Sequence, residues 1–136
     1  MAKPSDYTLN KSDVRVLLAL VIFSLILTAC RGGDRNDPQA VVEDYLQAKV
    51  SRDKDTIQKL LCSEMETFLE RETHTFETVS DARIDDLSCT WEEDRSIVRC
   101  QGKILASYGA EQTEYPLEAY RVVQEDGEWK WCGEGR

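Results

Sequence analysis

Residues 88–100 read SCTWEEDRSIVRC, and this stretch decides the fold. Apolar and polar residues alternate on both sides of an acidic turn, the period of two that is typical of half-buried strands. A hairpin with its turn between Asp94 and Arg95 places Cys89 directly opposite Cys100. Such cross-strand pairs hold their β-carbons about 4.5–5.5 Å apart, close to bonding distance. The stretch therefore predicts an antiparallel hairpin closed by a Cys89–Cys100 disulfide.

The same alternation continues outward from the hairpin. Upstream, Asp85 and Leu87 share the parity of Cys89 and are expected on its face of the sheet. Downstream, alternate residues as far as Tyr108 are mostly apolar. Gly102 interrupts this second strand and predicts a bulge or bend, as a curved sheet needs.

Two further strands are expected after the hairpin. A Gly109-Ala110 break precedes a strand over about 113–124. Asp126-Gly127 is a strong two-residue hairpin signal, and it leads into a final strand over 128–132. The sequence thus predicts a four-stranded antiparallel sheet.

Helical spacing precedes the sheet. An Asp-Pro pair at 37–38 is typical of a helix start and predicts a first helix over 38–51. A second, shorter helix is expected after Asp53. Ser63 and Glu66 match a capping box and predict the start of a third helix. Helices followed by strands indicate the α+β class, with N-terminal helices packed on a curved antiparallel sheet.

The pattern of helices and closing hairpin resembles the nuclear transport factor 2-like family. The resemblance is carried by residues 41–48 in the first helix and 126–132 in the last hairpin, and it covers roughly residues 38–134. It implies a cystatin-like, cone-shaped domain, whose sheet in the family usually has five or six strands. Family members include isomerases, dehydratases, binding proteins and partner-docking modules, so the fold alone settles no function.

The first thirty residues predict export. Residues 16–29 form a run of fourteen apolar or small residues, shorter than the roughly 20 needed to span a bilayer, and basic residues precede it. This arrangement is typical of a secretory signal. The run ends at 27–30 as Leu-Thr-Ala-Cys, which resembles the lipobox of bacterial lipoproteins and implies cleavage before Cys30 and lipid on its sulfur. The alternative is an ordinary signal peptide or marginal anchor helix with a chance cysteine.

These segments predict the organisation of the chain. Residues 1–30 are the expected lipoprotein signal, 31–37 a flexible tether and 38–136 a single domain. The expected location is the extracytoplasmic face of the cell membrane or the cell envelope, reached through the lipid anchor. Two or three acyl chains are enough for a stable anchor.

Export also bears on the remaining cysteines, because disulfides persist outside the cytoplasm. Once Cys89 and Cys100 are paired, Cys62 and Cys132 are left to bond to each other. Four buried free thiols are the alternative. A Cys-x-x-Cys motif is absent, so no redox role is assigned.

Composition excludes several classes of function. The 136 residues carry a net charge of -9, which argues against nucleic acid as a partner because no basic surface can neutralise phosphates. A single histidine and scattered cysteines argue against a histidine-based metal site. We expect no metal and no cofactor. The histidine, His74, is expected to face away from the apolar stripe of its helix.

The strongest candidate for a functional side chain is Glu72. It lies on the apolar stripe of the third helix, four residues from both Phe68 and Phe76. A carboxyl buried there would have a raised pKa and could act as an acid or base. The alternative is a glutamate at the edge of the stripe that reaches solvent or pairs with an arginine.

Aromatic residues on the predicted strands are candidates for the wall of a pocket. Trp91, Tyr108 and Trp131 are chosen because each lies on an alternating strand face. The expected function is a lipid-anchored binding or interaction module without intrinsic catalysis, with an unknown protein partner or small ligand. The alternative is an isomerase-like or dehydratase-like enzyme that uses Glu72 or Asp85 as general base.

Overall fold

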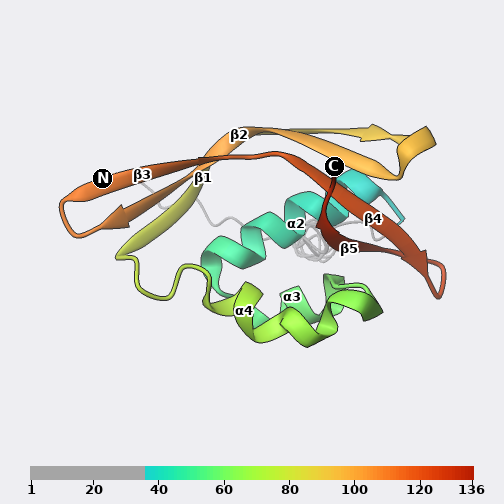
Figure 1. Cartoon of the computed structure of the whole chain (residues 1–136), viewed down its shortest axis with the longest axis horizontal. Coiled ribbons are helices and arrows are strands. Elements are labelled where there is room, and N and C mark those ends of the chain that lie inside the picture. Colours follow the sequence, from blue (N-terminus) through green and yellow to red (C-terminus); the bar gives the residue numbers. More distant parts are fainter. Residues whose placement is uncertain (1–35) are drawn as a thin grey trace, which may run out of the picture. The chain divides into compact units, whose positions relative to one another are not determined.

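The structure, a computed structural model, describes residues 36–136 (Figure 1). The predicted signal at 1–30, with Cys30, and most of the predicted tether lie outside these residues. The described helical segments are α2 (Pro38–Ser51), α3 (Lys54–Leu60), the 3₁₀ segment η1 (Ser63–Phe68) and α4 (Leu69–His74). None of the helices within 36–136 combines the length and apolar character needed to cross a membrane.

A five-stranded antiparallel sheet completes the described part of the chain. Its strands are β1 (Asp81–Glu92), β2 (Ile97–Tyr108), β3 (Glu111–Pro116), β4 (Ala119–Glu125) and β5 (Glu128–Glu134), and a 3₁₀ turn, η2 (Glu93–Arg95), joins the first two. The strand order is β1-β2-β4-β5, and β3 pairs with the second half of β2. The α+β class, with helices on a curved antiparallel sheet, is confirmed.

Helix α2 lies between the sheet and the pair α3 and α4 (Figure 1). The predicted start of α2 is present, since the Asp37 side chain accepts from the Gln39 N–H, and Asp53 likewise caps α3 by accepting from the Thr56 N–H. Burying apolar side chains on both sides of α2 supplies the main driving force of the fold. The buried residues of α2 are Pro38, Val41, Val42, Tyr45, Leu46 and Ala48.

The β1–β2 hairpin has the predicted register, with Cys89 opposite Cys100. These two cysteines are bonded, and so are Cys62 and Cys132. The second disulfide connects the start of η1 to β5, and the Cys62 N–H also donates to the Trp131 carbonyl. The 3₁₀ segment is therefore attached to the last strand by one covalent and one hydrogen bond.

The bend predicted at Gly102 is a β-bulge. The register between β1 and β2 shifts between Asp85 and Ser88, so that two residues of β1 face Gly102 alone. Asp86 has a φ of 54° and Gly102 a φ of 104°. The extra residue inverts the alternation of β1, so the prediction that Asp85 shares the face of Leu87 is wrong. Ala82 and Ile84 are the residues upstream of the bulge that pack against the core.

The prediction of one continuous strand over 113–124 is wrong. It is two strands, β3 and β4, separated by Leu117 and Glu118. Both pair with β2, but Pro116 ends the first because it lacks an N–H group. At the break, the Leu117 N–H donates to the Gly102 carbonyl, so the interruption lies beside the bulge. This division accounts for the fifth strand.

The capping box predicted at Ser63 and Glu66 is also wrong. The segment is a 3₁₀ turn without a side-chain cap, followed by the six-residue helix α4. The Ser63 hydroxyl and N–H both donate to the Glu125 carboxylate of β4 instead. A tertiary contact has therefore replaced the local one, and Phe76 falls in the turn after α4.

The bulge makes Gly102 a test of the sheet geometry. A β-carbon at this position would lie 2.5 Å from the carbonyl oxygens of Asp85 and Asp86. We expect Gly102→Ala to lower the free energy of unfolding by about 2 kcal/mol or more, through steric overlap and left-handed strain. Urea denaturation measures it.

Gly109→Ala is the matched control for this substitution. Gly109 also has a positive φ, 65°, but a β-carbon there meets nothing within 4 Å. Its cost should be backbone strain alone, about 1 kcal/mol. If Gly102→Ala and Gly109→Ala lowered the free energy of unfolding equally, the close approach of β1 to Gly102 would be contradicted.

Candidate functional site

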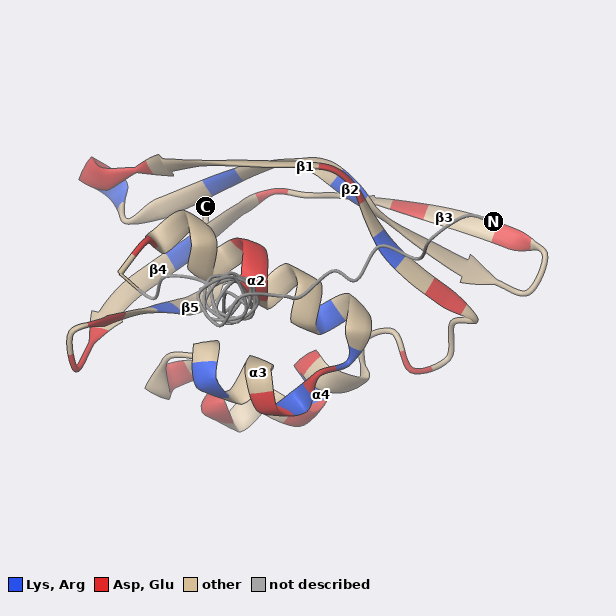
Figure 2. Ribbon diagram, turned by 180° about the vertical axis from the view of Figure 1, so that it is seen from behind, with Lys and Arg blue, Asp and Glu red and all other residues tan. Residues whose placement is uncertain are grey.

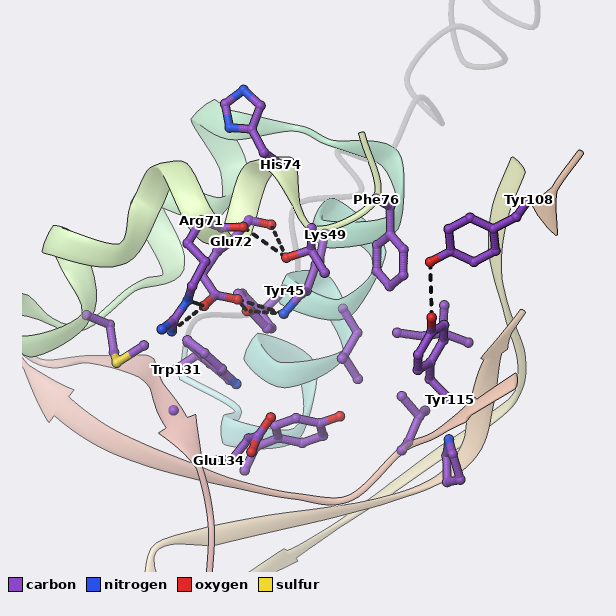
Figure 3. Close-up of a pocket in the computed structure, with 18 residues that line it drawn as sticks. Tyr45, Lys49, Arg71, Glu72, His74, Phe76, Tyr108, Tyr115, Trp131 and Glu134 are labelled. Atoms are coloured by element: carbon purple, nitrogen blue, oxygen red, sulfur yellow. Dashed lines mark hydrogen bonds and ion pairs between the residues drawn. The ribbon is translucent and has the colours of Figure 1, made fainter. Parts of the chain in front are cut away.

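A cavity of about 920 Å³ opens between the helices and the sheet. Its volume is in the range of small-molecule sites, which are usually apolar with a few well-placed polar groups. Six aromatic rings line it, those of Tyr45, Phe76, Tyr108, Tyr115, Tyr120 and Trp131. Leu46, Met65, Ile104 and Leu117 add aliphatic surface. Helices α2 and α4 supply most of its charged side chains, and Glu134 comes from β5 (Figure 3).

The charged wall of the cavity is organised around Glu72 of α4, whose exposed fraction is 3%. Its Oε2 accepts from the Tyr45 hydroxyl at 2.7 Å and from Lys49 Nζ at 2.6 Å, both on α2. Its Oε1 accepts from Arg71 Nε at 3.0 Å and from Nη2 at 2.7 Å. Tyr45 and Lys49 lie one turn apart on one face of α2, and this spacing lets both reach the same oxygen.

These contacts decide the ionisation of Glu72. Burial acts to raise the pKa of its carboxyl, but hydrogen bonds from Lys49 and Tyr45, with the Lys49 charge, outweigh it, so the pKa lies below its ordinary value. Of the two readings of Glu72 from the sequence, the lowered pKa agrees with a glutamate paired with an arginine and not with a desolvated acid or base. In return, burial and the hydrogen bond to Glu72 raise the pKa of Tyr45, which stays a neutral donor. Glu72 is a carboxylate at neutral pH.

The same contacts limit what Glu72 can do chemically. An ionised carboxylate has about four acceptor positions, and among residues 36–136 Tyr45, Lys49 and two nitrogens of Arg71 fill four. A general base needs an oxygen within hydrogen-bond reach of the substrate proton. Glu72 is placed as the partner of two cations, and the alternative of a glutamate paired with arginine describes it better than a catalytic role.

The aromatic rings form two groups. Deep in the cavity, the rings of Tyr45 and Trp131 stack with centroids 3.9 Å apart and planes 14° from parallel. At the mouth, the Tyr108 and Tyr115 hydroxyls lie 3.0 Å apart (Figure 3). Phe76 meets Tyr115 edge to face at 6.2 Å. Stacked and edge-to-face rings are both favourable geometries, so the walls are held by their own contacts.

Of the residues chosen from the sequence, the structure brings Glu72, Tyr108 and Trp131 to one cavity. Trp91 does not join them. It lies by the η2 turn and packs edge to face against Trp129, with centroids 5.1 Å apart. The bulge explains the difference in part, because Trp91 and the cavity residues of β2 lie on opposite sides of it along the hairpin. Asp85 is likewise absent from the described lining.

His74 lies at the edge of the cavity, where its side chain is exposed as predicted. Its Nδ1 is 2.7 Å from the carbonyl oxygen of Glu70, one turn back on the same helix. This contact keeps the ring on the outer side of α4 (Figure 3).

The indole N–H of Trp131 is unusual because it is buried and makes no hydrogen bond to a described residue. Figure 3 shows the nitrogen end of the indole turned toward the cavity. A buried donor without a partner costs about 1–3 kcal/mol. The wall of the cavity therefore contains a donor without a described partner, and this nitrogen exposes almost no surface, so an acceptor from outside the chain reaches it only where neighbouring side chains move aside.

One cluster outside the cavity has the composition of a metal site. Cys62, Glu64 and Cys132 place potential ligand atoms within 4.8 Å of one another. The two sulfurs are bonded to each other, and metals are bound by thiolates rather than by disulfides. The cluster is therefore explained by the disulfide and the nearby Glu64 carboxylate.

Sequence reasoning missed Lys49, Arg71 and Tyr115. Lys49 could have been found, because it lies four residues after Tyr45 and so shares the face of the first helix. A buried glutamate also requires a cation nearby, which points to Arg71 as the next residue in the chain. The sequence gives no sign of Tyr115, because the stretch 111–116 shows no apolar alternation, and in the structure all residues of this strand are exposed.

The Glu72 contacts predict a pH dependence of stability. A carboxyl whose pKa is lower in the folded chain than in the unfolded chain stabilises the fold above the unfolded value. That stability is lost as pH falls below about 4.3 and through the lower folded pKa. We expect Glu72→Gln to lower the free energy of unfolding by about 3 kcal/mol at pH 7, the low end for a buried ion pair, because Arg71 is largely exposed. The deficit should shrink in acid.

Glu70→Gln is the control for this prediction. Glu70 pairs with Lys54 on the exposed side of α4, so its replacement should change stability little at either pH. Denaturant titrations at pH 7 and pH 3 measure both variants. A Glu72→Gln deficit that is the same at the two pH values would contradict the lowered pKa.

Comparison with known proteins supports the fold. No family model and no curated protein matches the chain. Among solved structures, a designed protein titled Rd1NTF2_05, carrying five substitutions, matches with a TM-score of 0.53 at 15% identity, over 74% of this chain and 98% of its own. A SEC-C motif containing protein from Rhodopseudomonas palustris matches with a TM-score of 0.56 at 16% identity, over 78% and 84%. At these identities the likeness concerns the backbone alone, and the described domain has a nuclear transport factor 2-like fold.

Proposed function

We propose that this chain is a lipid-anchored, extracytoplasmic binding module that takes a small molecule into the cavity and does not transform it. The observation that carries the proposal is an aromatic-lined cavity of about 920 Å³ whose one buried carboxylate is already held by Tyr45, Lys49 and Arg71. Binding requires only the apolar walls and a few oriented polar groups. Catalysis by Glu72 would require one of its filled acceptor positions to be freed first.

The position of the module rests on the sequence. The apolar run at 16–29 and the lipobox-like ending at Cys30 support a diacylglycerol anchor at that cysteine. The spacer of residues 31–37, fully extended, reaches at most about 25 Å. An anchored domain would therefore stay close to the membrane and meet ligands that are exported, imported or released there.

The anchor can be tested with a single substitution. Cys30→Ser should abolish incorporation of radiolabelled palmitate and leave a precursor that still carries residues 1–29, because no thiol remains to receive lipid. Metabolic labelling in a bacterial host and mass spectrometry of the product measure this. Cys62→Ser is the control and should still be labelled. Unchanged labelling and cleavage of Cys30→Ser would contradict the anchor.

Binding can be tested at the mouth of the cavity. The probe is the neutral molecule 3-phenylpropanol, titrated calorimetrically into the full chain in lipid nanodiscs, with empty nanodiscs as the blank. We expect saturable binding at one site, weakened about tenfold by Tyr115→Asp, because a charge replaces an apolar contact. Tyr115 is 40% exposed, so the substitution should leave the fold intact.

Gln112→Asp is the control, because Gln112 lies on the same strand as Tyr115, is exposed and lies outside the described cavity lining. It should bind the probe as the unmodified chain does. An unmodified chain that does not bind 3-phenylpropanol, or equal losses in the two variants, would contradict a ligand in this cavity.

A further inference from the structure

We propose that the cavity selects a monocarboxylate with an apolar body, whose carboxylate lies between Lys49 and Trp131. This inference rests on the proposed function and names the class of ligand. The inner wall of the cavity consists of Tyr45, Lys49, Glu72 and Trp131. Lys49 and Trp131 each keep an N–H donor without a described partner, whereas the acceptor positions of Glu72 are filled.

The first donor is Lys49. Its ammonium group has three N–H bonds. Two of them serve Glu72 Oε2 at 2.6 Å and the Tyr45 hydroxyl at 3.3 Å. Lys49 lines the cavity, and Figure 3 shows its nitrogen turned toward the interior. One N–H is therefore left for an acceptor that the described residues do not supply.

The second donor is the indole N–H of Trp131. It is buried and without a partner among residues 36–136, and its ring stacks on Tyr45, the residue to which Lys49 also donates. Both donors thus flank one tyrosine. A carboxylate has two oxygens and can accept from both, which an alcohol with a single oxygen does less well.

Lys49 is the cation that an acceptor inside the cavity would meet. Its charge is balanced by that of Glu72, and the two outer charges of the lining, those of Arg71 and Glu134, are both exposed to solvent and screened. An anion is therefore preferred through a charge-assisted hydrogen bond from the remaining Lys49 N–H rather than through net charge. Figure 2 shows Asp and Glu spread over the helices, strands and turns, with Lys and Arg among them.

The opposite wall fits an apolar body. Phe76, Ile104, Leu117 and the Tyr115 ring line it. An amine-bearing ligand of the same shape would bring its cation against Lys49, where the acceptor positions of Glu72 are filled, and the remaining carboxylate of the described lining, Glu134, is exposed to solvent. The arrangement therefore discriminates by the sign of the ligand charge as well as by shape.

Three probes of matched shape test the inference: 3-phenylpropionate, 3-phenylpropanol and 3-phenylpropylamine. Each is titrated calorimetrically into the full chain in nanodiscs at pH 7. We expect the carboxylate to bind about tenfold more tightly than the alcohol, as a charge-assisted hydrogen bond warrants, and the amine to bind most weakly. If the alcohol binds as tightly as the carboxylate, or the amine binds best, the inference fails while the binding function stands. If none of the three binds, both fail.

Lys49→Met identifies the residue responsible. It should reduce affinity for the carboxylate about tenfold and leave affinity for the alcohol within about twofold. Lys54→Met removes the same charge from α3, where Lys54 pairs with Glu70 outside the cavity, and should change neither. A carboxylate preference that survives Lys49→Met would overturn the assignment. The comparison of probes on the unmodified chain tests the inference even if this variant does not fold.

Discussion

The arrangement of the cavity depends on one buried carboxylate. Glu72 stands on a helix of only six residues, too short to be stable by itself. Its contacts with Tyr45 and Lys49 attach that helix to α2, and the stacking of Tyr45 on Trp131 extends the attachment to β5. A carboxylate buried without these partners would cost several kcal/mol. The inner wall therefore has one stable arrangement, which also fixes the direction of its donors.

A second constraint shapes the opposite wall. The bulge at Gly102 inverts the alternation of β1, and the break at Leu117 divides the neighbouring strand at the same level. Bulges increase local twist and bend the strand that contains them. The sheet consequently curves around α2 (Figure 1), and the distal half of β2 with β3 carries Ile104, Tyr108 and Tyr115 to the cavity. Locked polar contacts on one side and a bent sheet on the other leave the space between them open.

Local signals in the sequence predicted much of the fold. The hairpin register, the starts of the first two helices and the bulge at Gly102 all follow from residues close together in the chain. Predictions failed where a distant residue intervened. Glu125 takes the Ser63 groups that a helix cap would have used. The extra residue of the bulge reverses the face of Asp85, which a strict period of two cannot anticipate.

The candidate site shows the same division. The helical spacing placed Glu72 on an apolar stripe but left open whether the side chain is buried or lies at the edge of the stripe. The direction of its pKa shift depends on Lys49 of α2 as well as on the adjacent Arg71, and the spacing does not show Lys49 beside it. Likewise, the parity of Tyr108 and Trp131 placed them correctly, whereas Trp91 has the right parity but lies too far along the hairpin. The two-residue alternation of a strand predicts which face a side chain occupies. Where that side chain lies along a curved strand can be seen only in the structure.

The most direct test of this account is the titration of the Glu72 side-chain carboxyl itself. Carbon-13 NMR of the full chain, with the resonance assigned by comparison with Glu72→Gln, follows its ionisation between pH 2 and pH 8. The account predicts a midpoint below that of an ordinary glutamate, about 4.3, because the cations and Tyr45 stabilise the charged form. A midpoint near neutrality would mean that these partners do not hold the carboxylate. It would contradict the locked wall and favour a free, desolvated base in the cavity.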